Sequence, residues 1–429
     1  MEKEQARMSE EIRRNYRPRI IDREISEMLS IFGGVLIAGP RSCGKSWTGL
    51  KHSNSAFFLG DENTSDLASM DPQAVLTGEY PRLIDEWQDV PKLWDLARRN
   101  IDFGLRKGMY IFTGSSLPPL DKTRHTGIGR FARLQMRTMS LYESGGSSGG
   151  VKLSELFSAG RTDVVRSGLD YQKAVALICR GGWPGVLEID DEKAMRVPYE
   201  YINSIAELDT ARIDGVKRNA AIMKLVLRSL ARNNATSAKA SVITADISEI
   251  GGDVSEQTVR SYIEFLKKIY IIEEQPPWHP SLRSRIRVRT SPVRHYTDPS
   301  LAAAALGANP KTLWKDTKTT GLLFESLCYR DLSIYASAIR ANVFHYRDNS
   351  DLEVDAVIET GGGDWGAVEV KMGRNQFDKA AANLIRMKNK MVEAGCREPS
   401  FMMILNATGG VANTRPDGVV EVPIDCLGP

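Results

Sequence analysis

The stretch "GVLIAGPRSCGKSWTGLKH", residues 34–52, decides the fold of the N-terminal part of the chain. Its apolar start has the length of a buried strand, "SWTGLKH" can open a helix, and "GPRSCGKS" between them fits GxxxxGK[ST]. Such a loop curls at its glycines, so that backbone N–H groups point at phosphate oxygens. The alternative is a glycine turn with an exposed lysine. The strand and the helix around the motif favour a phosphate loop in a parallel α/β sheet.

The residue types of this loop predict bound ATP and Mg²⁺. Lys45 would reach the β- and γ-phosphates, and the hydroxyl of Ser46 would hold Mg²⁺. The other residues that we expect to line the nucleotide are Gly39, Pro40, Arg41, Ser42, Cys43, Gly44 and Trp47.

A second part of the nucleotide site is predicted at "PRLIDEWQ", residues 81–88, an apolar strand that ends in two carboxylates, as in a Walker B segment. Asp85 would bind Mg²⁺, usually through water. Glu86 would orient or deprotonate the attacking water. The alternative is a strand that ends in a solvated acidic turn.

Hydroxyl and guanidinium groups follow in the next segments. The strand "YIFTGSS" (110–116) ends in hydroxyl residues, and Thr113 and Ser115 are candidate sensors of the γ-phosphate. A polar strand end is the alternative. The stretch "GIGRFARLQMR" (127–137) offers possible γ-phosphate ligands, either within one chain or across a subunit interface. These are Arg130, which is the favoured candidate, Arg133 and Arg137.

Bulk composition narrows the class of protein. The chain has 429 residues, 42% apolar and 26% charged, which suits a soluble globular protein of two to four domains. Its five cysteines are scattered and form no CxxC pair, which favours a reducing compartment. No apolar run approaches the roughly 18 residues that span a bilayer, and the charged N-terminus does not read as a secretory signal. We therefore expect a cytoplasmic protein without membrane contact. The net charge of +3 is too small to imply nucleic-acid binding by itself.

The order of elements predicts an α/β protein. Up to the run "ESGGSSGG" (143–150), a possible flexible hinge, apolar strands alternate with helical segments. The predicted strands there are "GVLIAG", "AFFLG", "PRLID" and "MYIFTG". Residues 151–232 read mostly as helix, broken at "GGWPG". The last part is mixed, with strands predicted at "ANVFHYR", "LEVDAVI", "WGAVEVK" and "SFMMIL".

Seven segments in this order resemble prokaryotic AAA-type ATPases with a winged helix and an uncharacterised, nuclease-like C-terminal domain. They are "YRPRIIDREI", "AGPRSCGKS", "LIDEWQ", "FTGSS", "GRFARLQMRTMSLYESGGSSG", "GGWPG" and "SPVRHYTDPSLAAAALGA". The resemblance covers nearly the whole chain and implies an ATPase architecture rather than a biological role. It implies an AAA-like P-loop NTPase core over 1–150, a helical lid over 151–217, a winged helix with a basic strand over 218–290, and an α/β domain of PD-(D/E)XK nuclease-like fold over 291–429.

Three helices are predicted before the basic stretch, at 219–232, 243–250 and 255–269. Ser255 is a plausible N-cap of the third helix, and apolar residues at helical spacing along that helix predict a face that packs in the core. That face consists of Val259, Ile263 and Leu266. The lengths and the "GGD" turn are consistent with a helix-turn-helix, which can dock onto DNA or onto protein.

The stretch "SLRSRIRVRT" (281–290) carries an arginine at every second position: Arg283, Arg285, Arg287 and Arg289. On an extended strand their guanidiniums would share one side, about 6.6 Å apart, which suits an anionic backbone. A solvated edge strand with ion pairs to an acidic neighbour is the alternative. Arg260 on the preceding helix is a further candidate for nucleic-acid contact.

The stretch "LEVDAVIETGGGDWGAVEVKMG", residues 352–373, predicts a pair of strands with charges on one face. Because side chains alternate along a strand, Asp355 faces the side opposite to Leu352, Val354 and Ile358. If the two strands pair, the side chains of Asp355, Glu369 and Lys371 converge. Two carboxylates that hold Mg²⁺ or Mn²⁺, with a lysine that orients water or stabilises charge, suit phosphodiester hydrolysis. The pattern alone is weak, and an ordinary strand pair with solvated charges is the alternative.

A helix acid strengthens the prediction. Glu325 in "GLLFESLCYRDL" would lie on a mostly apolar surface, where an acid is costly unless it is paired or metal-bound. The order of a helix Glu, a strand Asp and E-x-K resembles the PD-(D/E)XK fold, although Val354 stands where that fold has proline. Gln376 is a candidate further polar residue.

Together these features predict an Mg²⁺-dependent ATPase that couples its nucleotide state to nucleic-acid binding and metal-dependent phosphodiester cleavage. A second Mg²⁺ or Mn²⁺ would belong to the C-terminal site. The alternative is a nucleotide-dependent switch that binds a protein partner and has a silent nuclease-like domain, and a third possibility is a defence module whose nuclease waits on ATP. A homo-oligomer is possible in each case.

Overall fold

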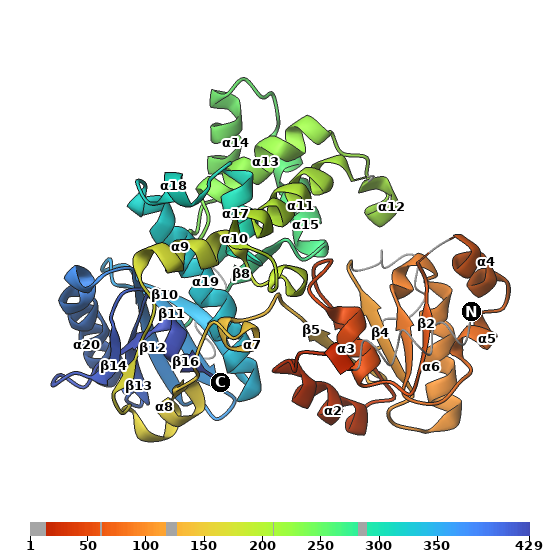
Figure 1. Ribbon diagram of the computed structural model, residues 1–429, viewed down its shortest axis with the longest axis horizontal. Helices are drawn as coiled ribbons and strands as arrows, with labels where there is room; N and C mark the ends of the chain where they lie inside the picture. The colour runs from red at the N-terminus through yellow and green to blue at the C-terminus, as the bar shows by residue number, and fades with distance from the viewer. Residues whose placement is uncertain (1–13, 61, 117–126, 209, 282–289) are drawn as a thin grey trace. The chain divides into compact units, whose positions relative to one another are not determined.

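The computed structural model describes residues 14–60, 62–116, 127–208, 210–281 and 290–429, and its contacts form two compact units (Figure 1). Unit 1 consists of Met1–Thr138, Asp209–Arg218 and Phe265–Tyr270. Unit 2 consists of Met139–Leu208, Asn219–Glu264 and Ile271–Pro429. This division differs from the four segments expected from the sequence, which remain predictions.

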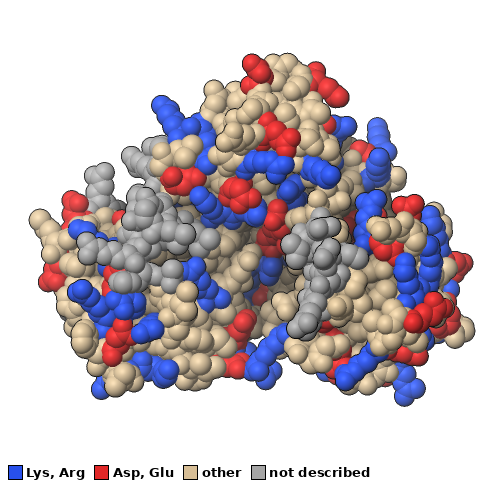
Figure 2. All heavy atoms as spheres, turned by 180° about the vertical axis from the view of Figure 1, so that it is seen from behind, with Lys and Arg blue, Asp and Glu red and all other residues tan. Residues whose placement is uncertain are grey.

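Charged side chains of both signs cover the surface. On the face drawn in Figure 2, Lys and Arg lie interspersed with Asp and Glu, as expected from a net charge of +3. Contact with an anionic polymer would therefore depend on local clusters of side chains. Within the described ranges, no helix is long and apolar enough to cross a membrane.

Unit 1 contains a five-stranded parallel sheet with the order β2-β3-β4-β1-β5. The strands are β1 (Gly34–Ala38), β2 (Ser55–Phe58), β3 (Arg82–Asp85), β4 (Tyr110–Gly114) and β5 (Phe131–Gln135). The four predicted strands are confirmed, and β5 is a fifth that was not predicted. Because all five strands are parallel, their carboxyl ends share one edge of the sheet, where the candidate nucleotide residues lie.

Alternate side chains of the β1 strand face opposite sides of the sheet, as the period of a strand requires. Val35 and Ile37 pack with one hydrophobic cluster, which includes residues of α2 (Ile21–Ile31) and α3 (Lys45–Lys51). Leu36 and Ala38 pack with the other, which includes residues of α4 (Glu62–Met70), α5 (Pro72–Leu76) and α6 (Lys92–Gly104). The sheet is therefore buried on both faces.

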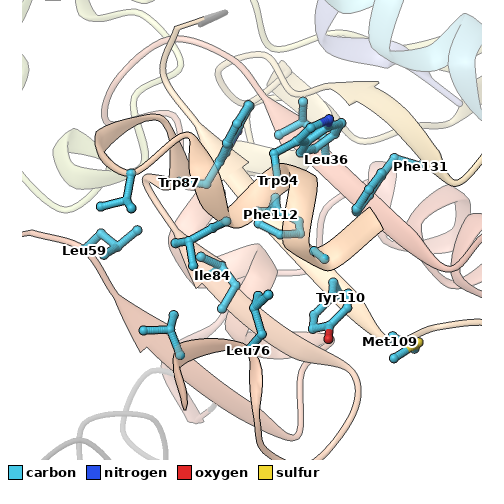
Figure 3. Close-up of a cluster of buried hydrophobic side chains, with 14 of the residues drawn as sticks. Leu36, Leu59, Leu76, Ile84, Trp87, Trp94, Met109, Tyr110, Phe112 and Phe131 are labelled. Carbon is cyan, nitrogen blue, oxygen red and sulfur yellow. The ribbon is translucent and has the colours of Figure 1, made fainter. Parts of the chain in front are cut away.

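Aromatic rings dominate the second of these clusters (Figure 3). The Trp94 ring stacks on Trp87 with centroids 4.7 Å apart and on Phe131 with centroids 4.1 Å apart. Phe112 of β4 packs edge-on against both Trp87 and Phe131. Since Trp87 follows the carboxylates of β3 directly, this cluster anchors the strand end that carries Asp85 and Glu86.

Unit 2 contains a seven-stranded mixed sheet with the order β10-β11-β12-β13-β15-β14-β7. The strands are β7 (Val165–Arg166), β10 (Ala341–Arg347), β11 (Glu353–Thr360), β12 (Trp365–Lys371), β13 (Phe401–Asn406), β14 (Val411–Thr414) and β15 (Val420–Pro423). The four strands predicted here, now β10 to β13, are confirmed. The antiparallel pairing of β11 with β12 brings the predicted Asp and E-x-K segments side by side.

Two long helices cover this sheet (Figure 1). α20 (Phe377–Glu393) packs on a hydrophobic cluster that includes Val354 and Val357 of β11. α19 (Thr317–Ala338) contacts β10, β11 and β12 and carries Glu325. The predicted alternation, in which Ile358 shares a face with Val354, is wrong, because a register shift in β11 reverses the strand's parity after Asp355.

The remaining part of unit 2 is mostly helical. Before the long helix α19 lie α8 (Leu153–Ala159), α9 (Tyr171–Arg180), α10 (Asp191–Ala194), α11 (Arg196–Glu207), α17 (Pro299–Ala305) and α18 (Pro310–Leu313). The three predicted helices are confirmed as α13 (Ala220–Arg232), α14 (Ala240–Glu249) and α15 (Glu256–Lys268), of which α15 continues into unit 1. Ser255 caps α15 by accepting from Thr258 N at 3.1 Å. β8 (Ile272–Gln275) and β9 (Val293–Tyr296) then pair antiparallel. Their assignment as a winged helix remains a prediction.

The glycine-serine run is held by hydrogen bonds and does not act as a free hinge in this structure. α7 (Leu141–Ser144) opens it with a capping box, and the hydroxyl of Ser147 donates to Leu427 O at 2.6 Å. Ser148 N donates to Asp425 O at 2.8 Å. β6 (Val151–Lys152) then pairs in parallel with β16 (Leu427–Gly428). The run therefore belongs to unit 2.

A buried charge cluster explains two further quoted segments. The guanidinium of Arg330 pairs with Asp298 at 2.9 Å and with Asp331 at 2.8 Å, and all three side chains are buried. Asp298 also accepts from Gly182 N, and Asp331 accepts from Leu141 N, both at 2.9 Å. The two carboxylates thus offset the charge of the buried arginine, and the backbone N–H groups donate to the carboxylates in turn. "GGWPG" and "TDPS" meet at this cluster.

Candidate functional site

The loop 39–46 connects β1 to α3 at the carboxyl edge of the unit 1 sheet. Gly44 has φ 105°, which L side chains rarely adopt, and Ser42 is also left-handed with φ 61°. A Cβ at Gly39 would lie 2.1 Å from Met136 O, so only glycine fits there. The loop therefore has the curled backbone that the sequence predicts.

Lys45 and Ser46 begin α3 beneath this loop. Lys45 is 4% exposed, and its ammonium donates to Pro40 O at 2.8 Å, inside the loop. The Ser46 hydroxyl donates to Asp85 Oδ2 at 3.0 Å. Of the other predicted loop residues, Pro40 and Cys43 are buried, whereas Arg41 and Trp47 are exposed.

The strand ends of β3 and β4 meet beside Ser46. The hydroxyl of Thr113 donates to Asp85 Oδ1 and accepts from Glu86 N at 3.1 Å. Burial raises the pKa of Asp85, although the hydrogen bonds from Thr113 and Ser46 oppose that effect. A bound cation is the natural counter-charge for a carboxylate in such surroundings. Ser46 and Asp85 therefore fit Mg²⁺ as a pair of oxygen ligands.

Glu86 is held in an unusual conformation. Its backbone is left-handed, with φ 52° and ψ 45°, which is rare for a residue with a side chain. Ser115 donates to Glu86 Oε2 at 3.0 Å, and Gln88 Nε2 donates to the same oxygen. Both donors bind one oxygen of the carboxylate. Gln88 was not predicted, because its position two residues after Glu86 gives no recognisable pattern.

Arg19 supports the loop from the N-terminal segment. Its buried guanidinium donates to Cys43 O and to Arg137 O, each at 2.9 Å. It thereby joins the phosphate loop to the chain that leaves β5. The sequence marks this residue only as part of the quoted "YRPRIIDREI".

Arg130 does not lie near the loop of its own chain. It precedes β5, and its carbonyl accepts from Gly34 N at the start of β1, so it is at the sheet edge opposite the loop. Its guanidinium pairs with Asp102 at 2.8 Å. The prediction that Arg130 binds the γ-phosphate within one chain is therefore wrong, and only the option across an interface remains. Arg137 follows β5 at the loop edge, and Arg133 lies over the Trp94 ring at 5.9 Å.

This placement makes a prediction for a single chain. We expect Arg130→Ala to change ATP turnover less than about twofold at protein concentrations where the chain is monomeric, because the side chain is at the far edge of the sheet. Turnover measured beside size-exclusion chromatography checks this. A loss of about a hundredfold in the monomer would contradict the geometry.

A second candidate site lies in unit 2, in a pocket of about 980 Å³ between α19, β11, β12 and the start of α20. It is lined by all four residues predicted for the C-terminal site and by Gln376. Other polar residues in its wall are Lys318, Asp351, Glu353, Asn375, Lys379 and Asn383. The pocket therefore presents carboxylates and amines to one space.

Three of the predicted residues meet directly. The Lys371 ammonium pairs with Asp355 Oδ2 at 3.0 Å and with Glu369 Oε2 at 2.5 Å. Asp355 Oδ2 also accepts from Val370 N at 2.7 Å. The predicted convergence of these three side chains is thus confirmed. Glu325 lines the same pocket from α19.

Two carboxyl groups of the pocket, those of Glu369 and Glu325, have raised pKa values. Burial and the Asp355 carboxylate raise the pKa of Glu369 to about 7, and the same causes raise the pKa of Glu325 well above its usual range. Asn383 on α20 donates to Glu369 Oε1 and to Glu353 O. Asn383 therefore hydrogen-bonds to the site from α20, and sequence spacing did not single it out. The predicted candidate Gln376 lines the same pocket from the turn just before α20.

The donor set can hold a cation only after a rearrangement. Among the described residues, no group of three or more His, Cys, Asp and Glu is placed to hold a metal ion. The Lys371 ammonium lies between the two carboxylates that a cation would bridge. Carboxylate oxygens suit Mg²⁺ and Mn²⁺, so Asp355 and Glu369 fit such an ion once Lys371 moves aside.

A stability measurement can test the raised pKa of Glu369. Because the folded-state pKa is raised, the unfolded state ionises first, so the fold loses stability as the pH rises from the usual pKa of 4.5 to about 7 and loses no more above that. Glu369→Gln cannot ionise, so without divalent metal we expect it to be more stable than wild type by about 2 kcal/mol at pH 8. At pH 4 the difference should nearly vanish. Thermal unfolding in a chelator at both pH values measures it, and an equal gain at both would contradict the assignment.

The residues predicted to bind nucleic acid are mostly beyond the described ranges. Arg283, Arg285, Arg287 and Arg289 lie outside them. Arg260 lies on α15, where its guanidinium pairs with Glu256 one turn earlier. This part of the prediction is not tested.

Several solved structures are similar to the chain at low identity. The Walker-type ATPase PABY2304 of Pyrococcus abyssi is 15% identical, with 66% of this chain and 94% of that chain covered and a TM-score of 0.41. AMPPCP-bound DnaA of Aquifex aeolicus is 13% identical, covering 58% and 86%, with a TM-score of 0.25. The ORC1 protein of Aeropyrum pernix, solved in complex with DNA, is 14% identical, covering 70% and 96%, with a TM-score of 0.24. At these TM-scores the similarities carry no argument about function.

Different parts of the chain match different protein families. No curated protein matches it. Residues 171–312 and 320–427 match two families described as domains of unknown function, DUF8612 and DUF4143. Residues 33–144 match the family described as an AAA domain, and they contain the loop, both carboxylates of β3 and the hydroxyls of β4. Residues 33–144 therefore form a parallel-sheet P-loop NTPase domain that is similar to the AAA domain family.

Proposed function

We propose that the chain hydrolyses ATP with Mg²⁺ and that its nucleotide state controls nucleic-acid binding and metal-dependent phosphodiester cleavage in unit 2. One observation carries the ATPase part: Ser46, Asp85 and Thr113, which come from three different elements, are hydrogen-bonded in one row beside the loop. The four-segment division into ATPase core, lid, winged helix and nuclease-like domain belongs to this proposal.

In the ATPase site, each residue has a role that its position supports. The loop amides and Lys45 bind the phosphates, and Lys45 offsets the charge that develops on them. Ser46 and Asp85 would hold Mg²⁺, which would offset the charge of the phosphates when bound. Glu86 presents one carboxylate oxygen to the attacking water, while Ser115 and Gln88 bind the other.

In the pocket of unit 2, Asp355 and Glu369 hold Mg²⁺ or Mn²⁺, and Glu325 supplies a further carboxyl group. When bound there, a divalent ion would supply Lewis-acid stabilisation of charge at the phosphodiester. Lys371 moves from its position between the carboxylates to the substrate, where its ammonium stabilises charge on the phosphoryl oxygens. Arg260 and the four arginines of residues 283–289 bind the nucleic-acid backbone.

A second candidate is a nucleotide-dependent switch whose unit 2 pocket binds a protein partner and does not cut. The double ion pair of Lys371 favours it, since that pair satisfies both carboxylates without a metal. In that case neither DNA nor RNA would stimulate ATP turnover.

Cleavage of labelled single- and double-stranded DNA and RNA tests the proposal. Wild type is incubated with Mg²⁺ or Mn²⁺, with and without ATP, and ATP turnover is followed in the same tubes. Cutting that depends on the metal and changes with ATP supports the first candidate. ATP turnover without cutting, and without stimulation by any nucleic acid, supports the switch.

A further inference from the structure

Asp355, the strand carboxylate of the unit 2 pocket, lies in a β-bulge. β10 and β11 are in register on both sides of His345, but two residues of β11, Asp355 and Ala356, lie opposite that single residue. A bulge leaves backbone groups unpaired and changes the direction of a side chain, and bulges recur next to active sites. The bulge is what directs Asp355 toward the pocket while Val354 and Val357 both face the core.

The side chain of Gln275, the last residue of β8, pairs with the carbonyls at this bulge. Its Nε2 donates to Phe344 O and to Asp355 O, each at 2.9 Å. Gln275 is 1% exposed, so its amide makes both hydrogen bonds away from bulk water. Both N–H groups of the amide are used, and the amide holds the two strands together where the ladder is interrupted.

The oxygen atom of the Gln275 amide determines which ring nitrogen of the buried His295 carries the proton. Gln275 Oε1 can only accept, so His295 Nε2 at 3.0 Å must carry a proton and donate. His295 is neutral, since burial lowers its pKa to about 3, and its Nδ1 therefore accepts from the Ser326 hydroxyl at 2.8 Å. Ser326 Oγ accepts in turn from Asn234 Nδ2 at 2.7 Å. The hydrogen bonds thus run in one direction from Asn234 to Asp355 O.

This relay also contacts the helix that carries the second carboxyl group of the pocket. Ser326 follows Glu325 directly on α19, and the His295 ring stacks on Tyr329, one turn later, with centroids 4.2 Å apart and planes at 15°. Every side chain of the relay is buried. One network therefore holds the backbone of α19 at Glu325 and the backbone of β11 at Asp355.

We infer that Gln275 and His295 are positioning residues that set the Glu325 and Asp355 backbones relative to each other, so that the β8–β9 pair governs the geometry of the unit 2 pocket. The inference rests on the proposed function in taking these two acids as metal ligands. Beyond that function, the positions of the two acids depend on β8 and β9, which contribute no side chain to the pocket wall.

Amide hydrogen exchange of the full-length, metal-free protein tests the relay itself. Gln275→Met and His295→Leu keep the side-chain size but remove the polar atoms, and each should speed exchange about tenfold in both 353–358 and 322–329. His295→Gln offers a donor and an acceptor in similar places, so it should stay near wild type. Thr360→Val is a matched control on β11, since its buried hydroxyl has no hydrogen-bond partner among the described residues, and it should change neither segment. Faster exchange confined to 271–275 and 293–296, or no rescue by His295→Gln, would overturn the inference.

Mn²⁺ binding, measured by calorimetry, separates this inference from the proposed function. If wild type binds Mn²⁺ and Asp355→Asn abolishes it, we expect Gln275→Met and His295→Leu to weaken binding at least tenfold, and His295→Gln to restore it. Unchanged affinity in Gln275→Met would overturn the inference alone. If wild type binds no Mn²⁺, the metal-dependent function fails, and the exchange experiment still decides whether the relay holds the two segments.

Discussion

Lys45→Ala should lower ATP turnover by about 10²–10³-fold or more, the scale seen when one preorganised donor to a developing charge is removed. The ammonium is almost fully buried and lies inside the curl of the loop, 2.8 Å from Pro40 O. No other described side chain of the loop carries a buried positive charge there, since Arg41 is exposed. Loss of Lys45 therefore leaves the phosphate charge to the backbone amides and to Mg²⁺. Release of phosphate under excess ATP measures the effect.

Lys51→Ala is the matched control, because Lys51 ends the same helix and is exposed. It should leave turnover within about twofold of wild type. Both variants should unfold at temperatures close to that of wild type, which calorimetry checks. Turnover that persists in Lys45→Ala above one tenth of the wild-type rate would remove the ATPase assignment.

Glu369→Ala should abolish metal-dependent cleavage, with a fall of at least about 10³-fold, since it removes a ligand on which several kcal/mol of charge stabilisation depend. Glu369 is 3% exposed, and its two oxygens face Lys371 and Asn383. The loss of this carboxylate would leave Asp355 as the only strand ligand. The same labelled DNA and RNA substrates measure it, with Mg²⁺ and Mn²⁺ in separate lanes.

Glu393→Ala near the end of α20 serves as the control for charge and should cut like wild type, because that residue is exposed and is not part of the pocket wall. A Lys45→Ala lane shows whether ATP governs the cutting. If Glu369→Ala cuts as fast as wild type, the nuclease comes from elsewhere, and the E-x-K residues are structural.

The sequence was most informative where one short segment determines its own structure. Every apolar run predicted as a strand is a strand, and in the parallel sheet of unit 1 the runs of β1 and β4 are buried along their whole length. The loop after β1 is curled as its glycines require. The strand β5 was missed although "FARLQ" alternates buried and exposed residues, as an edge strand does.

Strand direction explains the error at Arg130. In a parallel sheet, a residue before a strand lies at the amino edge, and the nucleotide loop lies at the carboxyl edge. Arg130 precedes β5 and so lies at the amino edge of the sheet, whereas Arg137 follows β5 and lies at the carboxyl edge, near the loop. The information was present in the sequence, but it required the fifth strand.

The bulge at Asp355 could not be predicted, because strict alternation fits the letters of β11 equally well. The Asp355 carbonyl at the bulge accepts from Gln275, which lies 80 residues earlier in the chain. Arg19, Asn383 and His295 were missed for the same reason. Their partners are backbone or side-chain atoms of distant segments, and no local period records such contacts.

The pairing of the glycine-serine run with residues 425–428 also determines when this segment can fold during synthesis. Ser147 must wait for Leu427, 280 residues later, before its hydrogen bond can form. At about 5–20 residues per second on the ribosome, that delay is roughly 15–55 s. The strands of unit 1 lie within residues 34–135, so their sheet can assemble while the rest is being made. During synthesis, the five-stranded sheet of unit 1 could thus form well before the glycine-serine run can pair with residues 425–428.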